Sequence, residues 1–140
     1  MFENPCRAEK VDYEHSDLRK KLNGEIFESF PEEIKGRMVG MRVGQTNCFD
    51  MLRIPTEREI FGENLYGKDE PVSVRRFYGM ENRRERIAFQ GSETGTWEWY
   101  WLQNKVEDSA SIFAYVHDNG YASFDYASTS LGVRPVFLLS

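Results

Sequence analysis

The stretch SIFAYVHDNGYASFDYA, residues 111–127, carries the strongest local fold signal in the chain. Asn119-Gly120 is typical of a tight hairpin turn, because both residue types accept the positive φ that such turns require. The flanking segments 111–117 and 121–127 are rich in aromatic residues, which favour strands. We therefore expect two antiparallel strands, with residue 121 opposite 117, 123 opposite 115, and 125 opposite 113.

Alternation along these strands separates two faces of the hairpin. One face of the first strand is small and apolar, which suits a core, and the other is polar and aromatic, which suits a recognition surface. Tyrosine together with serine, asparagine and aspartate is typical of adaptable binding faces. An ordinary half-solvated sheet also favours aromatic residues, so both interpretations stay open. The core set is Ile112, Ala114 and Val116, and the recognition set is Ser111, Phe113, Tyr115 and His117.

Two further strands are expected near the hairpin. WEWYWLQ, residues 97–103, places Trp97, Trp99 and Trp101 on one face, with Trp101 buried and Trp97 the most exposed. The C-terminal SLGVRPVFLLS, residues 130–140, predicts a buried strand over 133–139, because a short apolar run bounded by glycine is typical of one.

The terminal strand carries specific expectations. Pro135 places it at an edge, at a bulge or at its own first residues. Val133, Val136 or Phe137, and Leu138 should be buried. Arg134 should be half-buried with a paired guanidinium and a structural role, because an arginine in an apolar strand needs water or a polar partner.

The N-terminal half reads as helical and irregular. Residues 16–30 predict a helix capped by Ser16, with an apolar stripe that repeats every four residues. A second short helix begins at Pro31, strands are expected within 37–44 and 48–54, and Thr56 to Glu59 matches a capping box that opens a helix reaching about Gly62. Residues 63–96 should be mostly irregular, with one helical turn near 72–78. The whole is one α+β domain over 1–140, with 1–12 disordered or a linker.

Composition limits the classes of partner. The 140 residues carry a net charge of −5, with a pI of about 5.1, which argues against nucleic-acid binding. The arginine-rich stretch 75–86 is interpreted as a solvated face of mixed charge. No membrane-spanning stretch or signal peptide is visible, so we expect cytoplasmic synthesis, with later association with a virion left open.

No catalytic or metal-binding pattern stands out. Cys6 and Cys48 are far apart and suggest neither a disulfide framework nor a zinc site. His117 is interpreted as a polar hairpin residue beside Asp118. Asp118 and Asp125 are too few for a calcium site, so we expect no cofactor, no metal and no enzyme activity.

Several segments, in order, resemble the DUF6273 family, which is common in gut Firmicutes and their phages. They are SDLRKKLNGEIFESF, DMLRIPTEREIFG, WYWLQ, AYVHDNGYASFDYAS and GVRPVFLL, within residues 12–140. The resemblance implies a C-type-lectin-like fold, related to formylglycine-generating-enzyme domains and to the variable proteins of diversity-generating retroelements. A formylglycine-generating site needs a C-terminal cysteine pair, which this chain lacks.

Two departures from the family pattern stand out. Gln103, Asn104 and Lys105 replace the usual Arg-Ser-Pro, and the sequence does not indicate the strands that often precede the first helix in the family. The departures suggest a shortened version of the family domain or one piece of a larger assembly.

The retroelement variable proteins bind ligands just before their C-terminus, which directs attention to the hairpin and the preceding loop. We therefore expect a non-catalytic binding module for a protein or glycan ligand, in a phage, prophage or bacterial surface setting. The rival hypothesis is an assembly subunit that uses the sheet face as a homo-oligomer interface; an enzyme of unknown type is the weaker third. Tyr126 joins the site only if a bulge turns it to the shared face. The predicted ligand-binding residues are Asn104, Lys105, Tyr115, His117, Tyr121, Ser123, Asp125 and Tyr126.

The vocabulary of residues 108–140 is also unusual. Lys, Glu, Gln, Met and Trp are absent there and common before it. Codons ending in a pyrimidine cannot encode these five types, so adenine-directed mutagenesis of asparagine-type codons would leave this composition. Strands and tight turns also disfavour Lys and Glu, and this alternative stays open.

Overall fold

The structure is a computed structural model. It describes residues 13–14, 16–42, 49–67, 74–89, 97–106, 109, 111–129 and 131–140. The expectations for residues 1–12, Cys6, Cys48 and the Trp97 side chain lie outside what it describes.

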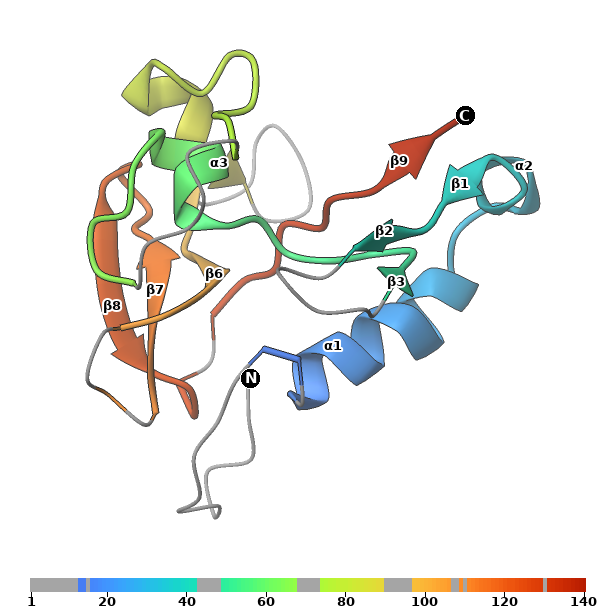
Figure 1. The fold of residues 1–140 in the computed structure, drawn as a ribbon, viewed down its shortest axis with the longest axis horizontal. Coiled ribbons are helices and arrows are strands. Elements are labelled where there is room, and N and C mark those ends of the chain that lie inside the picture. Colours follow the sequence, from blue (N-terminus) through green and yellow to red (C-terminus); the bar gives the residue numbers. More distant parts are fainter. Residues whose placement is uncertain are drawn as a thin grey trace.

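Short helices precede the main sheet, as expected for an α+β protein (Figure 1). The helical elements are α1 Asp17–Lys21, η1 Leu22–Ile26, α2 Glu32–Lys35, α3 Glu57–Phe61 and η2 Arg83–Arg86. The strands are β1 Met38–Val39, β2 Met41–Arg42, β3 Phe49–Asp50, β4 Ala88–Phe89, β5 Trp97–Glu98, β6 Tyr100–Lys105, β7 Ile112–Val116, β8 Ala122–Tyr126 and β9 Leu138–Leu139.

Local capping signals are confirmed. The Ser16 hydroxyl accepts a hydrogen bond from the Arg19 amide at 3.1 Å and so begins α1, which continues into the wider turn η1. Gly24 leaves helical geometry inside η1, with φ −108° and ψ −106°, which kinks the predicted helix. Thr56 and Glu59 form both halves of the predicted capping box at the start of α3.

The predicted strands of the N-terminal half are shorter than expected. The described part of 37–44 contains β1 and β2, separated by Gly40, and the described residues 49–54 contain β3. The described residues 74–77 form no part of the helical turn predicted near 72–78, and the next helical element along the chain is η2. Strands of two residues gain little from each other, so packing on the rest of the molecule must hold them.

The three-stranded antiparallel sheet β6-β7-β8 is the centre of the fold. Its hairpin has the predicted register, with Phe113 opposite Asp125 and Tyr115 opposite Ser123. The Asn119-Gly120 turn has the expected positive φ at Gly120, 87°. The hairpin signal in the sequence therefore defines both the turn and the pairing.

The predicted division of β7 into a core face and a recognition face is wrong. Phe113 is fully buried and Tyr115 is 6% exposed, although both were expected on the open face. They join Trp101, Leu18 of α1 and Leu22 of η1 in one apolar cluster. On the opposite face, side chains of α3 join two residues of β7 in a second cluster, which contains Ile60, Phe61, Tyr100, Leu102, Ala114 and Val116. β7 lies centrally between two layers, so both of its faces are dry.

The C-terminal segment departs most from the prediction. Instead of a strand over 133–139, it makes separate bridges from Gly132 to Tyr100 and from Val136 to Arg53 before pairing as β9 with β1. The expectation of burial is wrong for Val133, 36% exposed, and for Leu138, 53% exposed. In Figure 1 the segment leaves the sheet and runs toward β1, so it crosses the molecule instead of lying within one sheet.

Polar bonds hold the end of this segment. The Ser140 amide donates to the Arg37 carbonyl at 2.8 Å, and the Arg37 guanidinium donates to the Ser140 carbonyl at 3.0 and 3.1 Å. Phe137 meets the ring of Phe30 edge-on at 5.4 Å. The end of the segment is therefore anchored by these contacts and not by burial of Leu138 and Leu139.

Candidate binding surface

Strand β8 forms the outer edge of the central sheet (Figure 1). The His117 amide donates to the Tyr121 carbonyl, and the Ala127 amide to the Ser111 carbonyl, each at 2.8 Å. Because antiparallel hydrogen bonding alternates, residues 121, 123 and 125 bond to β7 while the backbone groups of residues 122, 124 and 126 are directed to the open edge. At the Tyr126 end of β8 the open edge has one free donor fewer, because the Tyr126 amide already donates to the Asp125 carboxylate at 2.7 Å.

One face of β8 continues the predicted recognition face. Tyr121 is 57% exposed, and the guanidinium of Arg83 lies 5.1 Å from the centre of its ring. Ser123 and Asp125 follow on the same face and are half-buried. On this face the side chains are therefore buried at β7 and reach solvent at β8.

The opposite face of β8 is exposed as well. Tyr126, which the alternation places on this face, is 59% exposed, and Phe124 is 48% exposed. The ring of Tyr66, from the loop after α3, meets Phe124 edge-on at 4.9 Å. Sequence reasoning missed Phe124 and Tyr66, because alternation places residue 124 on the face opposite Tyr121, Ser123 and Asp125, and nothing in the local pattern links residue 66 to the hairpin.

Arginines hold the hairpin turn from outside. Arg83 donates from Nη1 to the Asn119 carbonyl at 2.8 Å, and Arg86 donates from Nε to the Gly120 carbonyl at 2.9 Å. Burial lowers the pKa of Arg86, and the neighbouring Arg76 adds to the effect. The arginine-rich stretch is exposed at several positions, as expected, but it also fixes the turn that presents the candidate surface.

Gly120 shows how closely the two segments approach. A Cβ at this position would lie 2.5 Å from the Arg83 carbonyl oxygen, and its φ is positive. Glycine is therefore required twice, for the turn and for the contact.

Three predicted residues do not lie on β8, and of these only Tyr115 is buried, against expectation. Tyr115 is buried and stacks on Trp99, with ring centres 5.7 Å apart. Asn104 uses its side-chain oxygen to accept from the Glu57 amide at 2.7 Å. Lys105 is half-buried, with Nζ 6.0 Å from the centre of the Phe113 ring.

His117 stands at the boundary between core and surface. Its ring is 4.8 Å from that of Trp99, and Nδ1 lies 2.7 Å from Oδ1 of Asp118. The ring is half-buried. His117 can therefore contribute a polar edge next to Tyr121 but not a free, mobile imidazole.

Glu57 organises the loop that carries Tyr66. Its carboxylate is fully buried and accepts from the amides of Leu65, Tyr66 and Gly67 at 3.3, 3.0 and 2.7 Å. Three backbone donors satisfy a buried carboxylate without a metal. This carboxylate is therefore a loop anchor, which the capping-box motif alone did not reveal.

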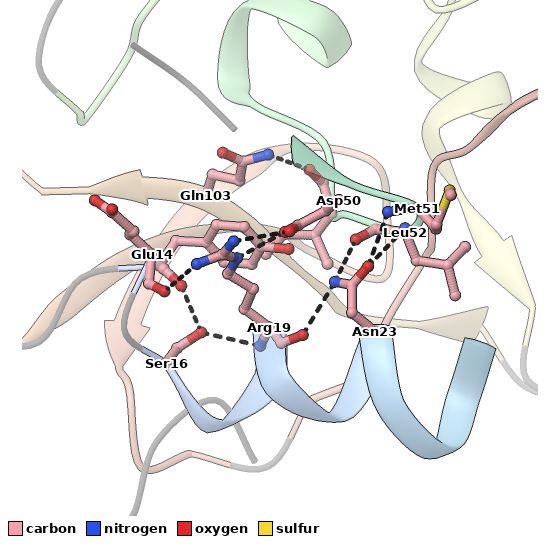
Figure 2. A network of polar contacts seen from close by, with 10 residues as sticks. Glu14, Ser16, Arg19, Asn23, Asp50, Met51, Leu52 and Gln103 are labelled. Carbon is pink, nitrogen blue, oxygen red and sulfur yellow. Dashed lines mark hydrogen bonds and ion pairs between the residues drawn. The ribbon is translucent and has the colours of Figure 1, made fainter. Parts of the chain in front are cut away.

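A second polar network joins α1 to the β3 segment (Figure 2). Arg19 donates from Nε and Nη2 to the two oxygens of Asp50 at 2.7 and 2.8 Å. Asn23 accepts from the amides of Met51 and Leu52 and donates to the Leu52 carbonyl. These groups bond to one another, so the network stabilises the fold and offers no open ligand site.

Within the described ranges, no group of three or more His, Cys, Asp or Glu side chains could hold a metal ion. In the same ranges, no helix has the length and apolar character needed to cross a membrane.

The fold and this surface describe the class of protein: an α+β protein whose three-stranded sheet is covered on both faces at its centre and exposes its outer strand. A family model described as domain of unknown function (DUF6273) matches residues 3–140, and the chain belongs to this family. No curated protein and no solved structure matches the chain.

Proposed function

We propose that this chain is a non-catalytic binding module that recognises a protein or glycan ligand through strand β8 and the 117–121 turn. The observation that carries the proposal is the exposure of Tyr121 and Tyr126, 57% and 59%, on opposite sides of one edge strand. Phe124, Ser123 and Asp125 lie between them. Rigid aromatic area beside short polar groups is the composition that recognition surfaces favour.

The proposed surface is a ridge and not the flat face expected from sequence. β8 extends beyond the layers that cover β7, so its side chains reach solvent in both directions. A ligand that wraps this edge would contact tyrosines from both faces. Such aromatic anchors carry a large share of binding energy in many interfaces.

The proposed setting is a phage, prophage or bacterial surface protein with a C-type-lectin-like fold. Membership of the DUF6273 family and the helices-then-sheet order support it. Retroelement diversification of residues 108–140 is part of the same proposal, supported by the absence of five residue types from that window. A nearby reverse-transcriptase gene and a near-copy of the 3′ end of this gene would be the decisive genomic observation.

The second candidate function is an assembly subunit. The backbone groups of Ala122 and Phe124 on the open edge favour it, because an unpaired edge strand can pair with another chain. Light scattering on the purified chain distinguishes the two functions, since a binding module stays monomeric at micromolar concentration.

The binding experiment uses labelled protein on a glycan array and on intact bacterial cells. We expect Tyr121→Ala/Tyr126→Ala to lower binding at least about tenfold while the melting temperature changes little. Tyr78→Ala is the matched control, because Tyr78 is fully exposed and belongs to neither β8 nor the 117–121 turn. Equal binding by the double variant and the wild type would overturn the proposed surface.

A further inference from the structure

A cavity of about 250 Å³ lies where α3, the 77–80 turn and the C-terminal segment meet. Its walls are apolar apart from one guanidinium. The lining residues are Pro55, Ile60, Phe77, Met80, Arg134, Pro135, Val136 and Phe137. This cavity contains none of the residues proposed above for ligand recognition.

Arg134 is the polar group of this cavity. Its hydrogen bonds within the described chain all come from Nη1, which donates to the Tyr100 hydroxyl at 3.1 Å and to the Arg86 carbonyl at 3.4 Å. The expected half-buried, partnered guanidinium is thus confirmed. Nε and Nη2 form the other edge of the guanidinium, and neither donates a hydrogen bond to a described residue.

No carboxylate among the described residues lies within ion-pair distance of Arg134. Two other partly buried arginines have carboxylate partners, whereas Arg86, like Arg134, donates only to uncharged oxygen atoms. Arg19, 21% exposed, pairs with Asp50, and Arg53, 13% exposed, donates two hydrogen bonds of 2.6 Å to Glu59. A partly buried cation without an anion is costly, and an incoming anion relieves that cost.

The volume of the cavity limits the size of the ligand that it can hold. A cavity of about 150 Å³ holds a benzene ring, and drug-sized ligands need at least about 300 Å³. The space at Arg134 therefore fits one ring or one branched chain with a small polar group. A guanidinium edge binds a planar carboxylate through two parallel hydrogen bonds.

We propose that this cavity binds a small monocarboxylate with an apolar body, whose carboxylate pairs with the Nε–Nη2 edge of Arg134. Ile60, Phe77 and Met80 cover the apolar body. Phosphates with several charges are disfavoured, because one arginine cannot balance them in an apolar pocket. Free acids and the C-terminal residue of a peptide share this chemistry.

The experiment compares 3-phenylpropanoate with 3-phenylpropanamide on the wild-type protein, with isoleucine, valine and methionine methyl groups labelled for NMR. We expect the acid to shift the methyl signals of Ile60, Met80 and Val136, and to leave Val39 and Ile112 unchanged. The neutral amide should bind at least about tenfold more weakly, because it cannot form the charged pair. Equal affinity for acid and amide, or no shift at the three lining methyl groups, would overturn the proposal.

Two variants locate the site. Arg134→Gln removes the charge and Met80→Trp fills the cavity, and each should weaken binding of the acid at least about tenfold. Arg84→Gln is the matched control, because Arg84 is exposed and does not line the cavity. Unchanged binding in a folded Arg134→Gln or Met80→Trp protein contradicts the proposal.

N-acetylphenylalanine distinguishes the two sources of ligand. Tighter binding than 3-phenylpropanoate, still dependent on Arg134, supports the site with a chain end as its natural occupant. Tighter binding of 3-phenylpropanoate supports it with a free acid. The result is independent of β8, since Tyr121→Ala/Tyr126→Ala should leave this binding intact.

Discussion

Two tyrosines of the same hairpin should respond in opposite ways to truncation. Tyr115 on β7 is 6% exposed and lies against Trp99 and Trp101, whereas Tyr121 in the turn is 57% exposed. Tyr115→Ala should destabilise the fold, and Tyr121→Ala should leave it nearly intact. The contrast tests whether β7 belongs to the core and β8 to the surface.

The magnitudes follow from burial. Removing a buried aromatic side chain costs about 3–5 kcal/mol, which includes the cavity left behind. For a chain of this size that corresponds to a fall in melting temperature of roughly 10–20 °C. Tyr121 loses mainly its contact with Arg83, worth about 0.5–1 kcal/mol at an exposed site.

Urea unfolding followed by tryptophan fluorescence measures both free energies. Tyr115→Phe is the control, because it keeps the ring and its contacts with Trp99 and Trp101. We expect it to stay within about 1 kcal/mol of the wild type. A Tyr115→Ala protein that loses less than about 1 kcal/mol, or a Tyr121→Ala protein that loses as much as Tyr115→Ala, would refute the placement of these strands.

Three further predictions concern the groups that support the candidate surface. Glu57→Ala leaves the amides of residues 65–67 without their acceptor, so it should cost about 3 kcal/mol or more in urea unfolding; a loss below about 1 kcal/mol would contradict the anchoring role. Gly67→Ala places a Cβ 2.6 Å from Cβ of Asn104 and should cost about 1–3 kcal/mol, whereas Gly40→Ala, which also has no positive φ and whose Cβ would meet Phe49 at an ordinary 3.6 Å, is the control without a clash. Burial raises the pKa of Tyr100 above its usual 10.0, so its stabilising contribution is complete below pH 10.0 and is lost as the pH rises further; Tyr100→Phe should therefore flatten the alkaline decline of the unfolding free energy, and an unchanged decline would count against this cause.

Local sequence determined the elements whose signals are contained within a few residues. Ser16 and Thr56 cap the helices they were expected to cap, because a side chain and the amide three residues later lie close in any helix. Asn119-Gly120 also predicted the hairpin register, because a tight turn places the residues on either side of it opposite each other. The half-buried, partnered state of Arg134 followed from the cost of an arginine in an apolar segment, although its partners could not be named.

Only the tertiary structure decided which faces are covered. Alternation separates the two sides of β7, but it cannot state that α1 covers one side and α3 the other, so the sequence left Tyr115 on an open face. The same limit explains Asn104, whose partner Glu57 is far away along the chain. It also explains the terminal segment: an apolar run predicts a buried strand, while the path of this segment from Gly132 to β1 leaves Leu138 exposed. Burial depends on contacts between residues distant in sequence, and no local pattern contains that information.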